Sequence, residues 1–201
     1  MEKRNVRSFQ LSILGALIIG IGIWIFFQMP TQPAQVLPNL GQAPSFSLID
    51  EQGHVFSSRK LKHRIWIVDF IYTKCKDTCP LITEKMEQLQ NLFHNNSKVL
   101  FVSLTVDPKY DTPAILKKFS KLHHANLKTW FFLTGARRKI DSIAQNGFKV
   151  TDAYNSKTNA FVHSSQFILV DQTGHICGYY DPLWPKDFHK LQMDIQTLLR
   201  K

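Results

Sequence analysis

Hydrophobic residues gather along this chain in patterns that alternate between strands and helices. Arg64–Tyr72 and Lys98–Val106 are dense in β-branched and aromatic residues, which is typical of strands buried on both faces. Leu81–Phe93 places its apolar residues at helical spacing, with Glu and Lys on the other face. Shorter apolar runs predict strands at Pro44–Asp50, Val55–Phe56, Thr129–Leu133, Ser165–Val170 and His175–Tyr180, and helices at Pro113–Leu122, Ala136–Gln145 and Asp187–Leu199.

The order of these elements predicts the fold class. Three strands come first, helices then alternate with strands, and a hairpin and a helix close the chain, giving β-β-β-α-β-α-β-α-β-β-α. This order predicts an α/β sandwich around a mixed central sheet. Asn146-Gly147 is expected to end a helix in the left-handed conformation, and Phe148–Ala160 is predicted to be an inserted hairpin or loop.

Leu11–Phe27 is an apolar segment that no charged residue interrupts. As a helix it covers about 26 Å, and with its flanks to Met29 it is just long enough to span the hydrocarbon core of a bilayer. Lys3, Arg4 and Arg7 precede the segment and no Lys or Arg follows until Arg59, so the amino terminus is expected in the cytoplasm. Bulky residues end the apolar run where a cleavable signal has small ones, which predicts an uncleaved signal anchor.

Four segments follow from these patterns. Residues 1–10 are predicted to be a cytoplasmic amino terminus, residues 11–29 a transmembrane anchor, residues 30–43 an uncharged linker rich in Pro and Gln, and residues 44–201 a single folded domain. A domain of this length buries a core without needing a disulfide framework. The chain is therefore expected to cross the membrane once, with its folded domain outside the cytoplasm.

The net charge of +10 changes this picture little. The basic residues are scattered, and no Arg-rich stripe is interleaved with aromatic residues, which excludes the common classes of nucleic-acid-binding domain. A solvated basic surface is the plainest interpretation. A surface attracted to anionic lipids or to an acidic partner is the alternative.

Cys75 and Cys79 carry the clearest candidate chemistry. They follow a buried strand and stand at the start of the helix predicted at Leu81–Phe93, where backbone N–H groups and the helix dipole stabilise thiolates. Three residues separate them, which is about one helical turn, so their sulfur atoms can form a disulfide or hold one metal ion. Two structural cysteines are the alternative, although open α/β sheets place their ligand sites at such strand-to-helix junctions.

A metal at this pair needs at least one further ligand. Thiolates prefer Cu(I), zinc or iron–sulfur clusters, and an added imidazole also admits Cu(II), but two cysteines alone cannot hold a cluster. Among the eight histidines, His163 stands apart because it ends a polar loop just before the strand at Ser165–Val170. In a thioredoxin-like sheet that connection lies beside the cysteine-bearing helix start. From the pattern alone, His163 is a candidate ligand and nothing firmer.

Several motifs together resemble the Sco/SenC family of copper-delivery proteins. FIYTKCKDTCP resembles the strand and Cys-x-x-x-Cys-Pro element of that family, and VSLTVDPKYDTP resembles its Asp-Pro-x-x-Asp-Thr-Pro element. WFFLTG resembles its Trp-x-x-Leu-Thr-Gly element, and VHSSQFILVDQTG supplies the His-Ser pair and the terminal hairpin. The resemblance runs from about Pro44 to the carboxyl end, in the order of the family.

The resemblance implies a thioredoxin-like fold with added amino-terminal strands, and one copper ion per domain bound by Cys75, Cys79 and His163. It implies delivery of copper to the dinuclear copper site of cytochrome c oxidase, so that the copper-site subunit is the expected partner, beside other copper chaperones or thiol reductants. It also implies an inner-membrane protein with its domain on the periplasmic side. Some members are credited with reducing the cysteines of that copper site, with Cys75 and Cys79 cycling through a disulfide.

One residue departs from the family pattern. Val162 stands where many relatives have an Asp before the histidine, which leaves the ligand set intact and puts the partner and the redox role in question. Three functions therefore remain open. The first is a copper chaperone that is not an enzyme, the second a thiol–disulfide oxidoreductase with Cys75 as the attacking thiolate, and the third and weakest a peroxidase.

Other polar and sulfur-containing residues receive plainer interpretations. Asp107 and Asp111 are expected to serve turn and capping chemistry, with Thr112 as the N-cap of the next helix, although a functional role stays open. Met86 is expected in the core. Cys177 is expected to be a buried apolar thiol, with a redox partner of the pair as the alternative.

Overall fold

The structure, a computed structural model, describes residues 36–75, 78–150 and 165–200, together with Trp24. The predicted transmembrane segment, apart from Trp24, and the loop that contains His163 and Val162 lie outside this part. Within it, no helix is both long enough and apolar enough to cross a membrane. The contacts divide the chain into residues 1–35 and a folded unit, Val36–Lys201.

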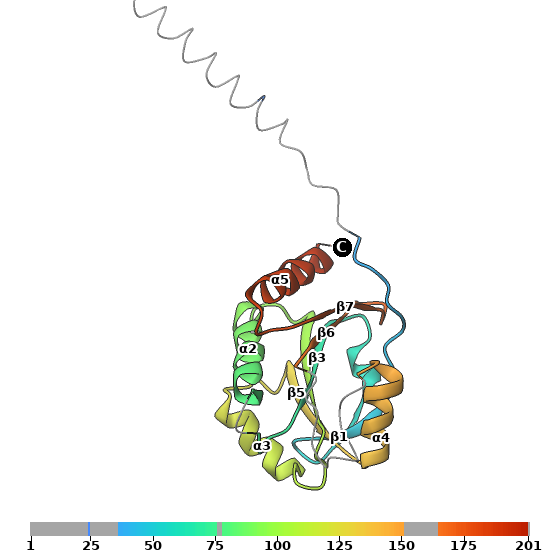
Figure 1. Ribbon diagram of the computed structural model, residues 1–201, viewed down its shortest axis with the longest axis vertical. Helices are drawn as coiled ribbons and strands as arrows, with labels where there is room; N and C mark the ends of the chain where they lie inside the picture. Colours follow the sequence, from blue (N-terminus) through green and yellow to red (C-terminus); the bar gives the residue numbers. More distant parts are fainter. Residues whose placement is uncertain (1–23, 25–35, 76–77, 151–164, 201) are drawn as a thin grey trace, which may run out of the picture. The chain divides into compact units, whose positions relative to one another are not determined.

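A mixed sheet of seven strands forms the centre of the folded unit, as far as the described residues show (Figure 1). The strands lie in the order β2-β1-β5-β4-β3-β6-β7. Neighbouring strands are parallel from β5 through β4 to β3 and antiparallel elsewhere. Their bounds are Ser47–Asp50 (β1), Val55–Ser57 (β2), Ile65–Ile71 (β3), Val99–Thr105 (β4), Trp130–Thr134 (β5), Phe167–Val170 (β6) and Ile176–Tyr180 (β7).

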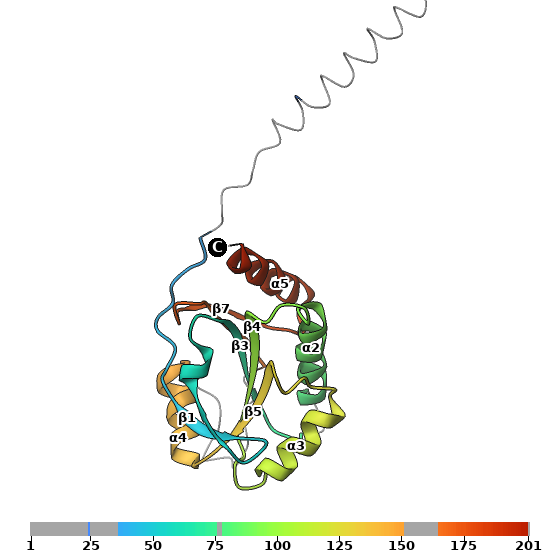
Figure 2. The same cartoon turned by 180° about the vertical axis from the view of Figure 1, so that it is seen from behind.

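Helices cover both faces of this sheet (Figures 1 and 2). One face carries α2 (Cys79–Leu92), α3 (Pro113–Leu122) and α5 (Pro185–Leu199), and the other carries α4 (Arg137–Ser142). A 3₁₀ turn, η1 (Ser58–Leu61), and a π-helical turn, η2 (Ile143–Gly147), pack on the same side as α4. The result is a three-layer sandwich, and the predicted order of strands and helices is confirmed.

The two hydrophobic cores follow from the alternation of side chains along the strands. In β3, Ile65 and Ile67 point into the core beneath α2 and α5, while Trp66 and Val68 point into the core beneath α4. All four are almost fully buried. Such burial on both faces explains why β3 and β4 form nearly continuous apolar runs in the sequence.

Gly147 does not have the predicted role. It is not in the left-handed conformation, and the chain instead continues through the π-helical turn to Lys149, whose φ is +57°. A Cβ atom on Gly147 would collide with the ring of Pro44. Glycine is therefore required here because the backbone approaches Pro44 closely, and the expectation of a left-handed helix end at this position is wrong.

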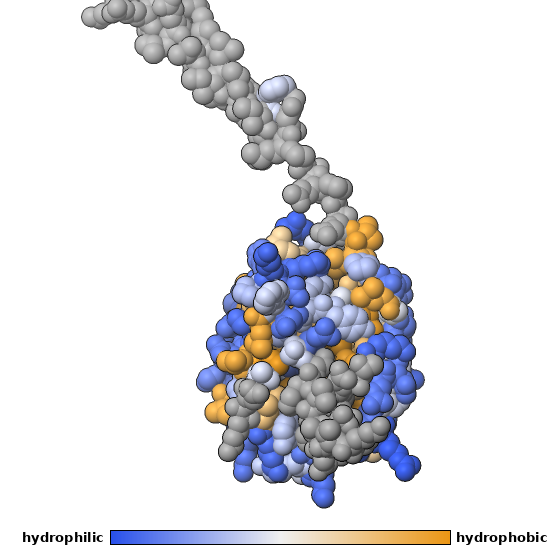
Figure 3. Space-filling view, viewed as in Figure 1, coloured by the Kyte–Doolittle hydropathy of each residue, from blue (hydrophilic) through white to orange (hydrophobic). Residues whose placement is uncertain are grey.

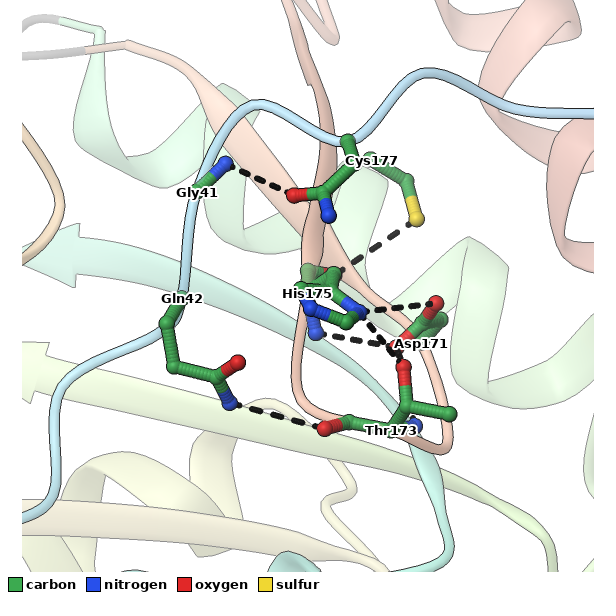
Figure 4. A network of polar contacts seen from close by, with 7 residues as sticks. Gly41, Gln42, Asp171, Thr173, His175 and Cys177 are labelled. Carbon is green, nitrogen blue, oxygen red and sulfur yellow. Dashed lines mark hydrogen bonds and ion pairs between the residues drawn. The ribbon is translucent and has the colours of Figure 1, made fainter.

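The folded unit begins before Pro44. Leu37 is buried, and the backbone from Leu40 to Ala43 runs beside β7 with three hydrogen bonds, Leu40 N–H to Ile176 O (2.8 Å), Ile176 N–H to Gly41 O (2.8 Å) and Ala43 N–H to Gly174 O (2.9 Å). A side chain adds to this contact, since Gln42 Nε2 donates to the carbonyl of Thr173 (3.4 Å; Figure 4). The second half of the predicted linker is thus part of the fold.

Hydrophilic residues cover most of the described surface on the face shown in Figure 3, and apolar residues form smaller spots between them. The lysines of α3 at positions 117, 118 and 121 are exposed. This distribution agrees with the predicted solvated basic surface.

Candidate metal centre

The cysteine pair lies where β3 gives way to α2. After Ile71 the chain turns, and the N–H of Cys75 donates to the carbonyl of Tyr72 (3.0 Å). Cys79 is the first residue of α2, and Pro80 follows in the first turn, where its missing N–H is of no consequence. The two cysteine side chains are joined by a hydrogen bond. The structure therefore brings the two cysteine side chains together, as the sequence predicts.

Their positions differ from the predicted arrangement in one respect. Only Cys79 belongs to the helix, and Cys75 stands in the turn before it, so the two do not sit one turn apart on a helix face. The turn gives them unequal environments. Cys79 is buried, with 5% of its surface exposed, and Cys75 is partly exposed.

These environments determine the protonation of the pair. Burial is the largest effect on Cys79 and raises its pKa far above the usual range, and the hydrogen bond with Cys75 and the charge of Cys75 act in the same direction. The backbone of Tyr72 lowers the pKa by less. For Cys79, burial thus outweighs the expected stabilisation of a thiolate by the helix start. Cys79 remains a thiol at neutral pH unless a metal or a reaction removes its proton.

The third predicted ligand is not among the described residues, since His163 lies in the segment 151–164. Within the described part, no three His, Cys, Asp or Glu side chains gather into a group that could hold a metal ion. The donor chemistry of the pair itself fits a soft metal, because two sulfur atoms in contact offer the ligands that Cu(I) prefers.

The Asp-Pro-x-x-Asp-Thr-Pro segment lies beside the cysteine turn. Thr112 caps α3 as predicted, its Oγ1 accepting the N–H of Ile115 (3.4 Å). The carbonyl of Asp107 accepts the N–H groups of Tyr110 (3.0 Å) and Asp111 (2.8 Å), which is the expected turn chemistry. Asp111, however, is fully buried, and its carboxylate accepts hydrogen bonds from Thr73, next but one to Cys75.

Asp69 is a buried polar residue that the sequence patterns did not single out. It lies in β3 with 1% of its surface exposed and accepts a hydrogen bond from Ser103 Oγ (2.7 Å), which in turn accepts from Trp130 Nε1 (2.9 Å). Its charge contributes to the raised pKa of Cys79. A charged residue in the middle of the apolar run Arg64–Tyr72 was the available signal.

Two other sulfur-containing residues belong to the core, as predicted. Met86 is fully buried beneath the sheet. Cys177 is buried in β7, and its Sγ donates to the carbonyl of His175 (3.5 Å; Figure 4). Val170 of β6 pairs on one side with Ile176, the neighbour of Cys177, and on the other side with Trp66 near the start of β3. Cys75 instead follows the end of β3. Five residues of strand separate those levels by about 16 Å, too far for a disulfide.

A cavity of about 420 Å³ lies away from the cysteines. It opens near the start of β3, beside Trp66, and its rim includes the basic residues Arg59 and Lys62. Residues Gln42–Ser45 close it from the side of the entering chain. Since Cys75 follows the opposite end of β3, this cavity is not part of the candidate metal centre.

Comparison with known proteins agrees with the motifs. The sequence model of the SCO1/SenC family matches residues 37–200. A SCO1 protein homolog from Bacillus subtilis is 30% identical over 154 residues, covering 76% of this chain and 80% of its own. The matched region contains the described unit from Leu37 on, including the cysteine pair and the residues around it.

Solved structures give the same result for the fold. A SCO1/SenC family lipoprotein from Bacillus anthracis superposes with a TM-score of 0.73 at 27% identity, covering 82% of this chain and 99% of its own. BsSco, described as a member of the Sco family of cytochrome c oxidase assembly proteins with a disulfide switch, gives 0.71 at 29%, covering 82% and 97%. Arabidopsis thaliana ScoI with copper bound gives 0.65 at 23%, covering 80% and 100%. The fold is the thioredoxin-like fold of these proteins, and this chain belongs to the SCO1/SenC family.

Proposed function

We propose that this protein binds copper at Cys75, Cys79 and His163 and serves in the assembly of cytochrome c oxidase. The observation that carries the proposal is the contact of Cys75 with Cys79 at the start of α2, in a chain of the SCO1/SenC family. BsSco is described as an oxidase assembly protein, and a more distant Sco structure holds copper. We propose the copper-site subunit of the oxidase as the partner that receives the ion.

The unequal thiols suggest how loading proceeds. A copper ion first meets the partly exposed Cys75, and its charge then favours loss of the proton from Cys79, whose burial otherwise keeps it a thiol. His163 would complete the site with an imidazole nitrogen. Binding thus releases protons, so copper affinity is expected to rise with pH.

We also propose that residues 11–29 anchor the protein in the inner membrane and that residues 1–10 remain in the cytoplasm. The copper-binding domain then faces the periplasm, where the oxidase site is assembled. Charge supports this orientation, since Lys and Arg residues precede the apolar segment and none follows until Arg59. The linker between anchor and domain is short, since the folded unit already begins at Val36.

A second candidate function is thiol–disulfide exchange, and the difference in exposure between Cys75 and Cys79 favours it. The Cys75 thiolate would attack a disulfide of the target, form a mixed disulfide and release one target thiolate. Cys79 would then lose its proton and attack the Cys75 sulfur, releasing the second thiolate. The target gains two electrons and the Cys75–Cys79 pair becomes a disulfide. Copper binding requires the reduced pair, so the two functions can be successive steps at one site.

Copper titration of the reduced full-length chain tests the proposal. The wild-type protein should bind one copper ion, and Cys75→Ser or Cys79→Ser should abolish tight binding, because a hydroxyl is a poor ligand for soft copper. His163→Ala should lower Cu(II) affinity roughly tenfold or more while sparing part of Cu(I) binding. His189→Ala, on the exposed side of α5, is the matched control and should bind as the wild type does.

Unchanged Cu(II) affinity in His163→Ala would sink the three-ligand site. Exchange is tested separately by mixing the reduced chain with an oxidised peptide that contains the two cysteines of the oxidase copper site. If the single variant Cys75→Ser exchanges as fast as the wild type, Cys75 is not the attacking group.

A further inference from the structure

We propose that Asp111 is the positioning residue of the candidate metal centre, which holds the turn that presents Cys75. The inference rests on the proposed function for its chemical meaning and on contacts of the described residues for its geometry. Asp111 belongs to the loop before α3 and is separated from Cys75 by a strand, a helix and their connections in sequence.

The carboxylate of Asp111 makes its main contacts with the cysteine turn. Oδ1 accepts a short hydrogen bond from Thr73 Oγ1, and Oδ2 accepts the backbone N–H of Thr73 (3.3 Å). Thr73 therefore uses both of its donors on one carboxylate. Thr73 is two residues before Cys75, and the intervening turn is closed by the bond from Cys75 N–H to Tyr72 O (3.0 Å).

Asp111 is itself held in place from the sheet. Thr105, the last residue of β4, donates a short hydrogen bond from Oγ1 to Asp111 Oδ2 and accepts the N–H of Asp107 at 3.0 Å. The N–H of Asp111 donates to the carbonyl of Asp107 (2.8 Å). One buried carboxylate thus joins the ends of β3 and β4 to the loop that precedes α3.

A second contact links the same two segments at the surface. The ammonium group of Lys74 lies over the ring of Tyr110, 3.5 Å from its centroid. Lys74 and Tyr110 are the immediate neighbours of Thr73 and Asp111, so the two contacts lie side by side. The inner one centres on the buried carboxyl of Asp111, and the outer one is a cation–π contact between two exposed side chains.

This arrangement is more than capping chemistry, because the cap of α3 is Thr112. Removing the Asp111 carboxylate would leave the N–H and hydroxyl of the part-buried Thr73 without their acceptor. The turn would then relax, and Cys75 would no longer be fixed relative to Cys79. Replacing a residue that orients a metal ligand without contacting the metal typically lowers metal affinity about 10-fold to 100-fold.

The test compares Asp111→Ala with Thr112→Ala in the full-length chain. Thr112→Ala removes the adjacent helix cap, costs stability and does not touch the cysteine turn, so it is the matched control. Two properties are measured, copper affinity and the rate at which iodoacetamide alkylates Cys75, followed by mass spectrometry. Asp111→Ala should lower copper affinity roughly tenfold and raise the alkylation rate, and Thr112→Ala should leave both near wild type.

Two further variants keep the test decisive if Asp111→Ala folds poorly. Asp111→Asn retains the volume and one oxygen acceptor and should give a smaller change in the same direction. Thr73→Val keeps the shape of Thr73 and removes its hydroxyl, so it should give part of the effect, and adding it to Asp111→Asn should change little more.

The alkylation rate separates this inference from the proposed function, because it needs no copper. If the wild-type chain binds no copper, the proposed function fails, and the alkylation rates alone decide the role of Asp111. Wild-type rates in Asp111→Asn and Thr73→Val overturn the positioning role, and so does an equal change in Thr112→Ala.

Discussion

Asp69 shows how a single residue can oppose the stability of its own fold. Its carboxyl is almost fully buried in β3, with Oδ1 bonded to Ser103, while Oδ2 has no hydrogen-bond partner among the described residues. Burial raises the pKa of Asp69 from 3.8 to about 7, and the hydrogen bond from Ser103 offsets only part of that. In the folded protein this group therefore holds its proton in acidic solution.

The raised pKa predicts a pH dependence of folding. Between about pH 4 and pH 7 the folded protein keeps the proton on Asp69 and the unfolded chain has released it. The free energy of unfolding should therefore fall as pH rises, by up to about 1.4 kcal/mol per pH unit, and level off above about pH 7. Asp69→Asn cannot ionise and should lack this dependence. From pH 5 to pH 8, its free energy of unfolding should therefore rise by about 2–3 kcal/mol relative to that of the wild type.

Urea unfolding of both proteins at these two pH values measures the difference. Glu84→Gln, which changes an exposed carboxylate of α2, is the control and should follow the wild-type dependence. Parallel curves for wild type and Asp69→Asn would show that Asp69 is not the titrating group.

At this scale the sequence revealed some site residues and concealed others. Cys75 and Cys79 were recognisable because thiols are rare and their spacing suits a metal. Asp69 and Thr73 were missed, since one is a lone charge in an apolar run and the other a common turn residue. Asp111 was expected to serve turn and capping chemistry, with a functional role left open, because its partners Thr73 and Thr105 lie on other elements and such contacts depend on tertiary structure.

Among the elements, α5 is held to β7 by a buried polar contact. Tyr180 of β7 donates its hydroxyl to Asp194 Oδ2 of α5 (2.6 Å), and Lys190 donates to the same oxygen. Burial, and then the bond to Asp194, raises the pKa of Tyr180 well above its usual range, so its hydroxyl remains a donor. The contact fixes α5, which contributes the buried side chains of Leu191 and Ile195 to the core on this face of the sheet.

Replacing either side of this contact should have different costs. Tyr180→Phe removes one hydrogen bond and leaves Asp194 paired with Lys190, so it should cost about 1–2 kcal/mol. Asp194→Ala leaves the buried hydroxyl of Tyr180 without this acceptor and should cost about 2–3 kcal/mol. Met193→Ala, at a half-exposed position of α5, should cost little. Thermal unfolding compares the three, and equal losses for Tyr180→Phe and Asp194→Ala would contradict this account.

The order of all the described strands and helices followed from hydrophobic periodicity, because nearly every element buries a face or lies wholly inside the sandwich. Their ends followed less well. Gly147 looked like a helix stop, but its role is to admit the ring of Pro44, about a hundred residues earlier in the chain. Local sequence patterns indicate which residues are buried. They do not indicate which residues far away in the sequence approach a given backbone position.

For the molecule as a whole, the sequence predicted the start of the folded unit too late, at Pro44, whereas the folded unit begins at Val36. Pro and Gln between residues 30 and 43 suggested a free linker, yet the segment from Leu40 to Ala43 is hydrogen-bonded to Ile176, the first residue of β7, and to Gly174 in the turn before it. Among the described strands, β7 lies at one edge of the sheet. An uncovered edge strand offers N–H and C=O groups to other chains. The segment from Leu40 to Ala43 therefore occupies the start of this edge, at Ile176.

This protection predicts different behaviour for two truncated proteins. A chain of residues 36–201 should fold on its own with one cooperative transition, because it contains the whole folded unit. A chain of residues 44–201 loses the buried side chain of Leu37 and three backbone hydrogen bonds to the end of the sheet and its adjoining turn, so it should be less stable by about 2–4 kcal/mol. The backbone groups freed at Ile176 lengthen the open edge of β7 and should also promote self-association, which sedimentation at rising concentration would detect. A third protein, residues 36–201 with Leu37→Ala, should lose stability but stay monomeric, since its backbone still pairs with Ile176 at the start of β7. Equal stability and equal monomeric behaviour of the two truncated chains would show that residues 36–43 are a linker after all.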